Sequence, residues 1–312
     1  MKNEQAGETI ANPSTDALGA SFPAFCQVAA QVSATTKRLE KAALLGAYFA
    51  PLNDDDLRVA ARFFAGSVFP LSDQRTLNVG QSALMKALLE VSQTDETLLR
   101  TRLVQLGDLG DLAGEVLPPL GTRSLSLREL EASFAMLAKT AGTKKKTEAV
   151  IALLKQLSPL EAKFAVKLMS GEWRIGIKES AVEDAIARLA QASVAQVQWT
   201  NMLTGDIGQT ALLARHGQLE SARLQLFAPL KFMLASPAAD LEEVARQMPE
   251  RFIVEDKYDG IRAQAHIAPH EIEYSNAHGT VVQNEADENK RVALFSRTLD
   301  EITRSFPDLL QP

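Results

Sequence analysis

Residues 38–50, Arg38-Leu-Glu-Lys-Ala-Ala-Leu-Leu-Gly-Ala-Tyr-Phe-Ala50, already indicate how the N-terminal part of this 312-residue chain folds. Their apolar side chains recur at i, i+3, i+4 and i+7, which is the spacing of one face of an amphipathic α-helix. Thr35 or Thr36 stands in front as a predicted N-cap. Comparable stretches follow at 57–66, 82–91, 125–140, 147–157, 159–170 and 180–190. The sequence therefore predicts an all-helical domain over residues 22–227.

Two motifs of this region recur at one fixed distance. Ser82-Ala-Leu-Met-Lys-Ala-Leu-Leu resembles Ser180-Ala-Val-Glu-Asp-Ala-Ile-Ala, and Gly107-Asp-Leu-Gly110 resembles Gly205-Asp-Ile-Gly208, each 98 residues later (180 − 82 and 205 − 107). Looser matches join Ala61-Arg-Phe63 to Ala162-Lys-Phe164, and Val79-Gly80 to Ile175-Gly176. A shared offset predicts two related helical halves, since a solenoid needs three or more shorter units. Such halves fit a pseudo-two-fold surface for duplex DNA, or a duplicated bundle with no bearing on DNA.

The helical pattern ends at two prolines in Ala228-Pro-Leu-Lys-Phe-Met-Leu-Ala-Ser-Pro237, which places a domain boundary near residue 227. Beyond a short predicted helix lies Ile253-Val-Glu-Asp-Lys-Tyr-Asp-Gly-Ile-Arg262, with the pattern E-x-K-x-D-G-x-R. Asp259-Gly260 is a strong turn pair. The alternation of apolar and polar residues after it predicts a strand–turn–strand unit with Gln264 and His266 on the ligand side. The alternative is a charged β-hairpin on the surface.

The chemistry of this segment centres on its lysine. A lysine acts as a nucleophile only after its ammonium loses a proton, so a reactive site must lower its pKa by burial or nearby positive charge. Arg262 can supply such a charge and can also hold a phosphate by two parallel hydrogen bonds.

The segment resembles the active-site motif of the covalent nucleotidyltransferases, which comprise ATP-dependent DNA ligases, RNA ligases and mRNA capping enzymes. The resemblance implies that Lys257 attacks the α-phosphate of ATP and forms a lysyl-AMP intermediate. It also implies that Glu255 binds the adenine amino group and that Arg262 contacts the ribose or phosphate side. Leu294-Phe295-Ser296-Arg297 resembles the next motif of the family, in which Arg297 helps to bind the nucleotide or the 5′-phosphate of DNA.

The helical region resembles the N-terminal DNA-binding domain of ATP-dependent DNA ligases. The matching residues are Gly171-Glu-Trp-Arg-Ile-Gly-Ile-Lys-Glu-Ser180, the two Gly-Asp-x-Gly turns and the basic loop Ala141-Gly-Thr-Lys-Lys-Lys-Thr147. The resemblance implies that five cations contact DNA phosphates: Lys144, Lys145, Lys146, Arg174 and Lys178.

Other residues of this region have simpler predictions. Gly176 and Gly208 stand where backbone N–H groups could meet a phosphate. Trp173 is expected in the core, and Asp108 and Asp206 are expected to cap helices rather than bind a metal.

The predicted fold class is multidomain, α and α/β. Residues 1–21 form a disordered tail, 22–227 an all-α DNA-binding domain with two related halves, and 228–312 the first part of an α+β nucleotidyltransferase (adenylation) domain. The family places its Mg²⁺-binding acids, triphosphate-binding lysines and OB-fold domain beyond Arg297, so we expect a truncated chain. Lys257 and Arg297 lie 40 residues apart instead of the expected ~20, two short strands and a turn. The excess, 269–291, predicts an extra hairpin or an acidic disordered loop.

The composition of the chain limits the classes of function to consider. A net charge of −6 and a pI near 5.4 count mildly against a nucleic-acid binder, but a local basic surface suffices for phosphate contacts. A single cysteine, Cys26, excludes a disulfide framework, indicates a reducing cytoplasm and is expected in the core. No signal peptide and no apolar run of ~20 residues predict a soluble, cytoplasmic monomer without a membrane partner. The spacing of His266, His270 and His278 fits no metal site.

The function favoured by these observations is that of an ATP-dependent DNA ligase. With ATP and Mg²⁺ it would seal nicks in double-stranded DNA during repair, replication or recombination, although this chain alone is expected to be inactive or nearly so. RNA ligases and capping enzymes are disfavoured because they are not expected to carry the duplicated Gly-Asp-x-Gly turns. The alternatives are a non-catalytic DNA-binding remnant of a ligase, and a helical interaction protein with a chance lysine motif.

Overall fold

The computed structural model describes residues 20–119, 124–232, 236–269 and 290–309. The chain divides into two compact units. Unit 1 contains residues up to 222 except 71–74 and 202–205, and unit 2 contains those two short segments together with residues 223–312. Among the described residues, no helix is both long and apolar enough to span a bilayer.

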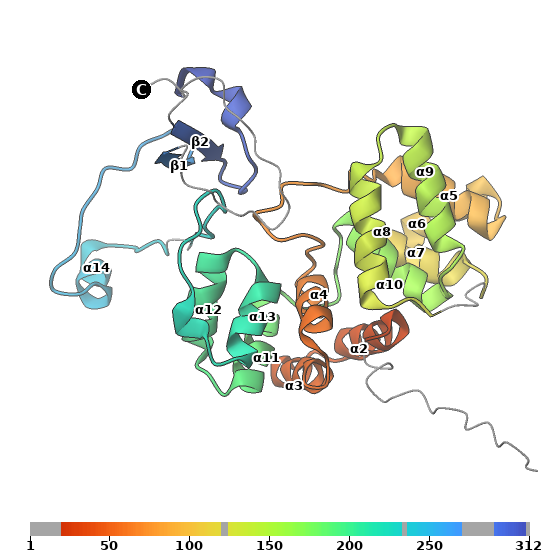
Figure 1. The fold of residues 1–312 in the computed structure, drawn as a ribbon, viewed down its shortest axis with the longest axis horizontal. Coiled ribbons are helices and arrows are strands. Elements are labelled where there is room, and N and C mark those ends of the chain that lie inside the picture. Colours follow the sequence, from red (N-terminus) through yellow and green to blue (C-terminus); the bar gives the residue numbers. More distant parts are fainter. Residues whose placement is uncertain (1–19, 120–123, 233–235, 270–289, 310–312) are drawn as a thin grey trace, which may run out of the picture. The chain divides into compact units, whose positions relative to one another are not determined.

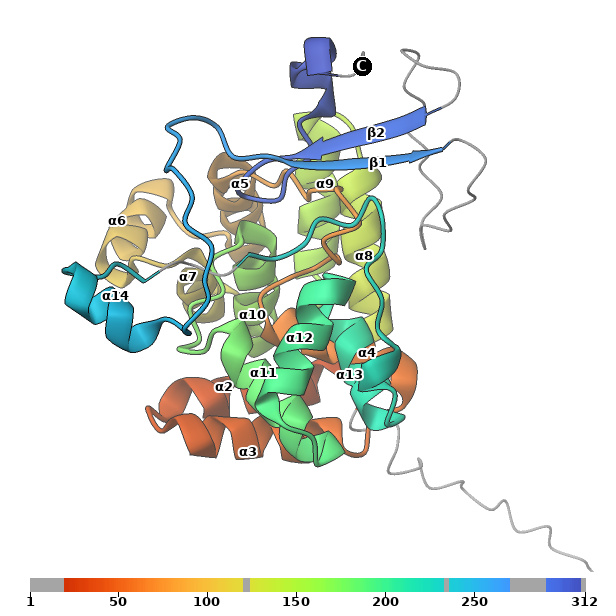
Figure 2. The same ribbon diagram turned by 90° about the vertical axis from the view of Figure 1, so that its left-hand side faces the viewer.

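Unit 1 is built from helices that pack in two groups, seen from two sides in Figures 1 and 2. The first group contains α5 (Gln81–Ser92), α6 (Glu96–Leu106), α7 (Leu109–Val116), α8 (Leu127–Lys139), α9 (Thr143–Leu154) and α10 (Pro159–Ser170). The second contains α2 (Phe22–Ala34), α3 (Arg38–Phe49), α4 (Asp54–Phe64), α11 (Glu179–Ala190), α12 (Val194–Thr204), α13 (Ile207–Arg215) and the 3₁₀ turn η1 (Leu219–Ser221). The last three residues of α12, 202–204, are counted with unit 2. The second group therefore joins the first three helices to the last three. The prediction of an all-helical N-terminal domain is confirmed.

Local sequence explains where several helices begin. Ser126 with Glu129, and Ser158 with Glu161, form capping boxes in which each side chain bonds the other residue's backbone N–H. Asn53 caps α4 by accepting a hydrogen bond from the Asp56 N–H. Such caps satisfy backbone donors that a helix start leaves unpaired.

Two closely packed helix pairs lie within each group. In the first group α5 packs on α9 and α7 packs on α10; in the second, α3 packs on α11 and α4 packs on α13. A short antiparallel bridge links the starts of α2 and α8, where Phe22 N donates to Leu125 O (2.7 Å) and Leu127 N donates to Ala20 O (3.0 Å). These two segments thus exchange equivalent hydrogen bonds.

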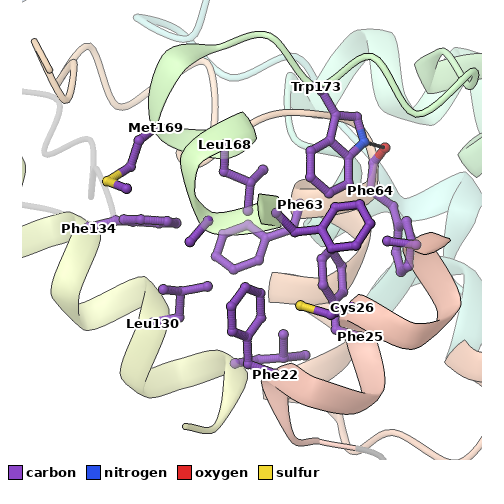
Figure 3. Packing of buried hydrophobic residues seen from close by; sticks show 14 of the residues in the cluster. Phe22, Phe25, Cys26, Phe63, Phe64, Leu130, Phe134, Leu168, Met169 and Trp173 are labelled. Carbon is purple, nitrogen blue, oxygen red and sulfur yellow. Dashed lines mark hydrogen bonds between the residues drawn. The ribbon is translucent and has the colours of Figure 1, made fainter. Parts of the chain in front are cut away.

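One apolar core runs through unit 1, and its aromatic centre appears in Figure 3. The Phe25 ring lies 4.4 Å from that of Phe64 and 5.9 Å from that of Trp173, measured between centroids. Trp173 is buried, and its Nε1 donates to Phe64 O at 3.0 Å. Cys26 is fully buried beside these rings, and burial raises the pKa of its thiol. The predictions that Trp173 and Cys26 are core residues are confirmed.

Unit 2 contains one antiparallel strand pair, β1 (Gln264–Pro269) and β2 (Lys290–Phe295), in which Gln264 pairs with Phe295 and Pro269 with Lys290. The remaining elements are α14 (Leu241–Gln247), η2 (Thr303–Ser305) and η3 (Pro307–Leu309). The small core consists of Phe227, Ala268, Ala293 and Phe295.

The predicted strand–turn–strand unit around Asp259-Gly260 is confirmed only at its end, where β1 begins at Gln264. Its first strand is wrong, because residues 251–263 contain no strand. Ile253, Val254 and Ile261 are 84%, 82% and 77% exposed. Among the described residues, β1 pairs only with β2, so no neighbouring strand holds residues 252–254.

The predicted ligand side of β1 is also wrong, because His266 and Ala268 face the core while Ile267 is exposed. His266 packs near the rings of Phe227 and Phe295, and its Nδ1 accepts a hydrogen bond from Phe227 N at 2.9 Å. The hydrogen bond satisfies the imidazole inside the core, so burial of this polar side chain is tolerated. Residues 1–19 of the predicted tail and 270–289 of the predicted insertion lie outside the described residues.

Candidate functional site

The segment from Gly171 to Ser180 forms an exposed, anchored turn in unit 1. Its side chains alternate, so that Arg174 and Lys178 face solvent while Trp173 and Ile175 are buried. Gly176 has φ +73°, a left-handed conformation that glycine adopts without strain. Lys178 is the N-cap of α11 and makes no side-chain cap bond. The turn therefore carries two predicted site cations outward on a fixed backbone.

Arg174 lies at the edge of a pocket of about 390 Å³, whose lining also includes Gly80, Gln81 and Gly107. Its Nη1 donates to Gly107 O at 3.2 Å, and its Nη2 lies 3.4 Å from Glu172 Oε2. The side chain is 60% exposed, so its guanidinium remains accessible to an anion. Sequence reasoning missed the pocket residues of α5 and its preceding turn, although the 98-residue offset, applied to 174–178, leads to 76–80.

The predicted basic loop at 141–147 is instead the first turn of α9, which begins at Thr143 after Gly142 at φ +85°. Lysine has a good helix propensity, and the left-handed glycine lets the helix start early. Lys144 and Lys145 are exposed. Lys146 is only 8% exposed, and its Nζ donates to Leu77 O at 2.6 Å. The structure thus leaves two of the three predicted lysines on the surface.

Both Gly-Asp-x-Gly turns place their aspartate at a helix start. Asp108 caps α7 through the Asp111 N–H, and Asp206 caps α13 through the Gly208 N–H. The prediction that both are helix caps is confirmed. Each is also ion-paired across the helix packing: Lys167 Nζ lies 2.6 Å from Asp108, and Arg62 Nε lies 2.8 Å from Asp206.

Gly208 does not present its backbone to a phosphate. It is buried, and a Cβ there would lie 2.6 Å from Arg58 O. Gly110 is equally crowded, since a Cβ would overlap the Lys167 side chain and lie 2.6 Å from Lys163 O. These glycines allow α13 and α7 to approach α4 and α10 closely.

The lysine motif of unit 2 is open to solvent. Lys257 is 88% exposed, and its Nζ lies 2.7 Å from Asp259 Oδ1. Arg262 stacks over the Phe232 ring at 5.3 Å, and Glu255 is exposed. Arg297 is exposed in the turn that follows β2. No hydrogen bond or ion pair joins these four residues within the described part of the chain, so the structure does not assemble them into one pocket.

The described residues contain no group of three or more histidine, cysteine, aspartate or glutamate side chains that could hold a metal ion. His266 is committed to the core of unit 2, whereas His270 and His278 lie outside the described residues. We assign no residue of this chain to the predicted Mg²⁺.

Comparison with known proteins assigns the helical part of the chain to a family. The family model described as DNA ligase N terminus matches residues 21–187. A probable DNA ligase of Koribacter versatilis is 38% identical over 288 residues, which cover 92% of this chain and 46% of that protein. The DNA ligase of Archaeoglobus fulgidus is 30% identical, with 94% and 51% covered, and that of Methanothermobacter thermautotrophicus is 31% identical, with 92% and 50% covered.

These matches define unit 1 as an N-terminal domain of the ligase class. The chain belongs to the DNA ligase family. It spans about half the length of the curated relatives it matches.

Proposed function

We propose that this chain is part of an ATP-dependent DNA ligase in which unit 1 binds the duplex around a nick and Lys257 takes AMP from ATP. One observation carries the proposal: the family-matched helical unit presents Arg174 and Lys178 outward on an anchored turn. We place the protein in DNA repair, replication or recombination, as a cytoplasmic monomer.

The proposal includes two related halves in unit 1. Helices α8, α9 and α10 begin 105 residues after α2, α3 and α4 (127 − 22), whereas α11, α12 and α13 begin 98 residues after α5, α6 and α7 (179 − 81). The residue after α5, Gln93, and its counterpart Gln191 are both left-handed, at φ 55° and 52°. These constant offsets support a duplication of six helices.

The 105- and 98-residue offsets revise the two looser sequence matches. They pair Arg62 with Lys167, and Asn78 with Gly176, instead of the pairs suggested by the residue letters. Asn78 and Gly176 are both left-handed, at φ 48° and 73°. Arg62 and Lys167 both bind the capping aspartate of a Gly-Asp-x-Gly turn. The shared backbone conformation of one pair and the corresponding aspartate partners of the other support the revised pairing.

The proposal also includes an exchange of helices between the halves, which the packing supports. Each packed group combines the first three helices of one half with the last three of the other. Backbones of a DNA duplex are related by a local two-fold axis, so two such groups suit contacts on both sides of a break. We propose phosphate contacts for Lys144, Lys145, Arg174 and Lys178. Lys146 is buried, so we assign it a different role below.

The chemistry proposed for Lys257 is nucleophilic. Its amine attacks the α-phosphorus of ATP, a nitrogen–phosphorus bond forms, and pyrophosphate leaves with the electrons of the broken phosphoanhydride bond. The 5′-phosphate at the nick then displaces the lysine, and the 3′-hydroxyl finally displaces AMP. Glu255, Arg262 and Arg297 are proposed to hold the nucleotide. Lys257 must first lose its proton and its contact with Asp259.

Intact mass after incubation with ATP and Mg²⁺ tests the role of Lys257. We expect adenylation to add the mass of one AMP to the parent and nothing to the Lys257→Ala variant. A gain in both would contradict the assignment of Lys257. No gain in either would favour the second candidate, a non-catalytic DNA-binding remnant, which the 88% exposure of Lys257 also supports.

Fluorescence anisotropy with a nicked duplex tests DNA binding. Affinity should fall with salt, and Arg174→Ala and Lys178→Ala should each reduce the slope of log K against log salt by about 0.9, the value for one phosphate contact. Lys155→Ala is the matched control, because Lys155 is a half-exposed cation paired with Glu90 at the other end of α9. If all three variants kept the salt slope of the parent, Arg174 and Lys178 would not contact DNA phosphates.

A further inference from the structure

We propose that Lys41 and Lys146 are positioning residues that aim two backbone N–H groups of unit 1 at the phosphates of DNA. The inference rests on the proposed DNA binding by unit 1. It adds a second contact turn, residues 76–80, and a physical reason for two buried lysines that the phosphate contacts themselves do not use.

The two lysines occupy equivalent positions. Lys41 on α3 is 6% exposed and Lys146 on α9 is 8% exposed, 105 residues later (146 − 41). The Nζ of Lys41 donates to Gly176 O at 2.7 Å, and the Nζ of Lys146 donates to Leu77 O at 2.6 Å. Each lysine thus belongs to one half and holds a turn of the other, although the two carbonyls are one residue out of register, since Leu77 corresponds to Ile175 and Asn78 to Gly176.

The two turns are also equivalent. Residues 76–80 and 174–178 are 98 residues apart and lead directly into α5 and α11. In both, the second residue is buried, as Leu77 and Ile175, and the next is exposed and left-handed, as Asn78 and Gly176. The buried apolar residue and the lysine therefore fix each turn from the inside.

Peptide geometry gives the lysines their effect. In a planar trans peptide the C=O and the following N–H point in opposite directions. Because the carbonyls of Gly176 and Leu77 point at buried ammonium groups, the N–H groups of Ile177 and Asn78 point away from them. Within the described residues neither of these two N–H groups donates a hydrogen bond. Neither group therefore has an acceptor within the described part of the protein.

The ammonium groups also supply charge. A buried ammonium costs desolvation that an apolar side chain of similar length, such as methionine, avoids. Here it places a positive charge directly behind an exposed turn, where it favours the approach of a phosphate. At the turn of residues 174–178, Arg174 and Lys178 face solvent around the same Ile177 N–H. Direct cation contacts and an oriented backbone donor would then act on one stretch of DNA backbone.

Lys41→Met and Lys146→Met in the full chain test the proposal, with a nicked duplex in fluorescence anisotropy at several salt concentrations. Each should weaken binding about tenfold, the factor for one hydrogen bond to a charged group. The salt slope should change by much less than the value of about 0.9 for a direct phosphate contact, because the buried ammonium itself touches no phosphate. Lys41→Arg and Lys146→Arg keep a donor and should recover most of the affinity. Lys163→Met, whose lysine pairs with Asp111 instead of a turn, is the matched control.

Amide NMR of the parent and variants provides a readout that a loss of stability would not mimic. In the parent, the Ile177 and Asn78 amide signals should shift on addition of DNA. Lys41→Met should abolish the shift of Ile177 alone, and Lys146→Met that of Asn78 alone. The parent measurement stands even if a methionine variant does not fold.

Three results separate the possible failures. A parent that does not bind the duplex overturns the proposed DNA binding and the positioning role together. A parent that binds while both amides stay still overturns only the positioning role. Folded methionine variants that bind as tightly as the parent also overturn only the positioning role.

Discussion

At the scale of single residues, the two Gly-Asp-x-Gly turns illustrate how one motif serves packing and charge at once. The first glycine of each, Gly107 and Gly205, takes the left-handed conformation at φ 67° and 61°. The aspartate caps the next helix and binds a buried cation. The last glycine removes the side chain that would separate two helices. The sequence predicted the caps, but the ion partners are distant in sequence and became visible only in the fold.

Gly208→Ala should destabilise unit 1 by about 1–3 kcal/mol, the usual cost of overpacking. The added Cβ would meet the Arg58 backbone oxygen, which cannot move as a side chain would. Gly46→Ala is the control, because that glycine lies inside α3 and a Cβ added there would come no closer than 3.9 Å to its nearest neighbour, Ala185 O. It should stabilise α3 by about 0.5–1 kcal/mol. Urea unfolding measures both, and equal effects would contradict the close helix packing.

His266 should make the stability of unit 2 depend on pH. Burial lowers the pKa of His266 below its ordinary value of about 6.5. The unfolded chain therefore binds the proton more readily, so stability is full above that ordinary value and falls as the pH drops through it. His266→Asn keeps an acceptor for Phe227 N and should remove this dependence. Hydrogen exchange of the β1 and β2 amides at pH 7.5 and 5.5 measures it; an unchanged dependence in the variant would assign it to other groups.

At the scale of elements, periodicity predicted helices at seven places in unit 1 and did not single out α6 and α12, among others. Val104 on α6 is 83% exposed and Trp199 on α12 is 61% exposed, so the apolar residues of these helices do not lie on one face. The strand prediction at 252–254 failed for a different reason. A strand needs a partner, and sequence alternation alone does not supply one.

The first turn of α9 separates surface lysines from a buried one. Lys144→Ala with Lys145→Ala should reduce the salt slope of DNA binding by up to about 1.8, because two phosphate contacts are lost. Thermal stability should hardly change, since both side chains are exposed. The single variant Lys144→Ala should give about half that effect on the slope. An unchanged slope in the double variant would place the start of α9 away from the DNA.

The ion pair between α10 and α7 should matter most near neutral pH. Burial alone would raise the pKa of Asp108, but hydrogen bonds from Lys167 and from the Asp111 and Gly110 N–H groups hold it below its usual range. The stability from this pair is therefore present above about pH 4 and is lost as the pH falls through the lowered pKa. Lys167→Met should cost about 3 kcal/mol at pH 7, because it leaves a buried charge without its cation.

The difference in stability between the parent and the same variant should shrink as the pH falls from 7 to 3, because Asp108 without its cation takes up a proton more readily than in the parent. Lys163→Met is the control, because its side chain is 32% exposed and its partner Asp111 is 36% exposed. We expect that variant to lose less than about 1 kcal/mol. Chemical unfolding at the two pH values measures both variants. Equal losses of stability in the Lys167→Met and Lys163→Met variants would show that the buried ion pair stabilises the protein no more than the exposed one.

At the scale of the whole molecule, the sequence predicted a duplicated helical domain from two short motifs, but not how its parts combine. Contacts such as that of Arg62 with Asp206, 144 residues apart, join the first helices of unit 1 to its last ones. No local pattern records such a pairing. The lysine motif shows the opposite case, since its letters resemble a nucleotide-binding motif while its side chains lie open around Lys257. Family membership rests on the family model over unit 1 and on relatives that match most of the chain, and catalysis is a proposal about the whole protein.

Hydroxyl-radical footprinting of the chain on a nicked duplex tests most directly the central claim, that unit 1 holds DNA on both sides of a break. We expect two protected patches, one on each strand and related by a two-fold axis near the nick. Arg174→Ala with Lys178→Ala should erase one patch and leave the other. Absence of protection, or protection that these substitutions do not alter, would contradict the account.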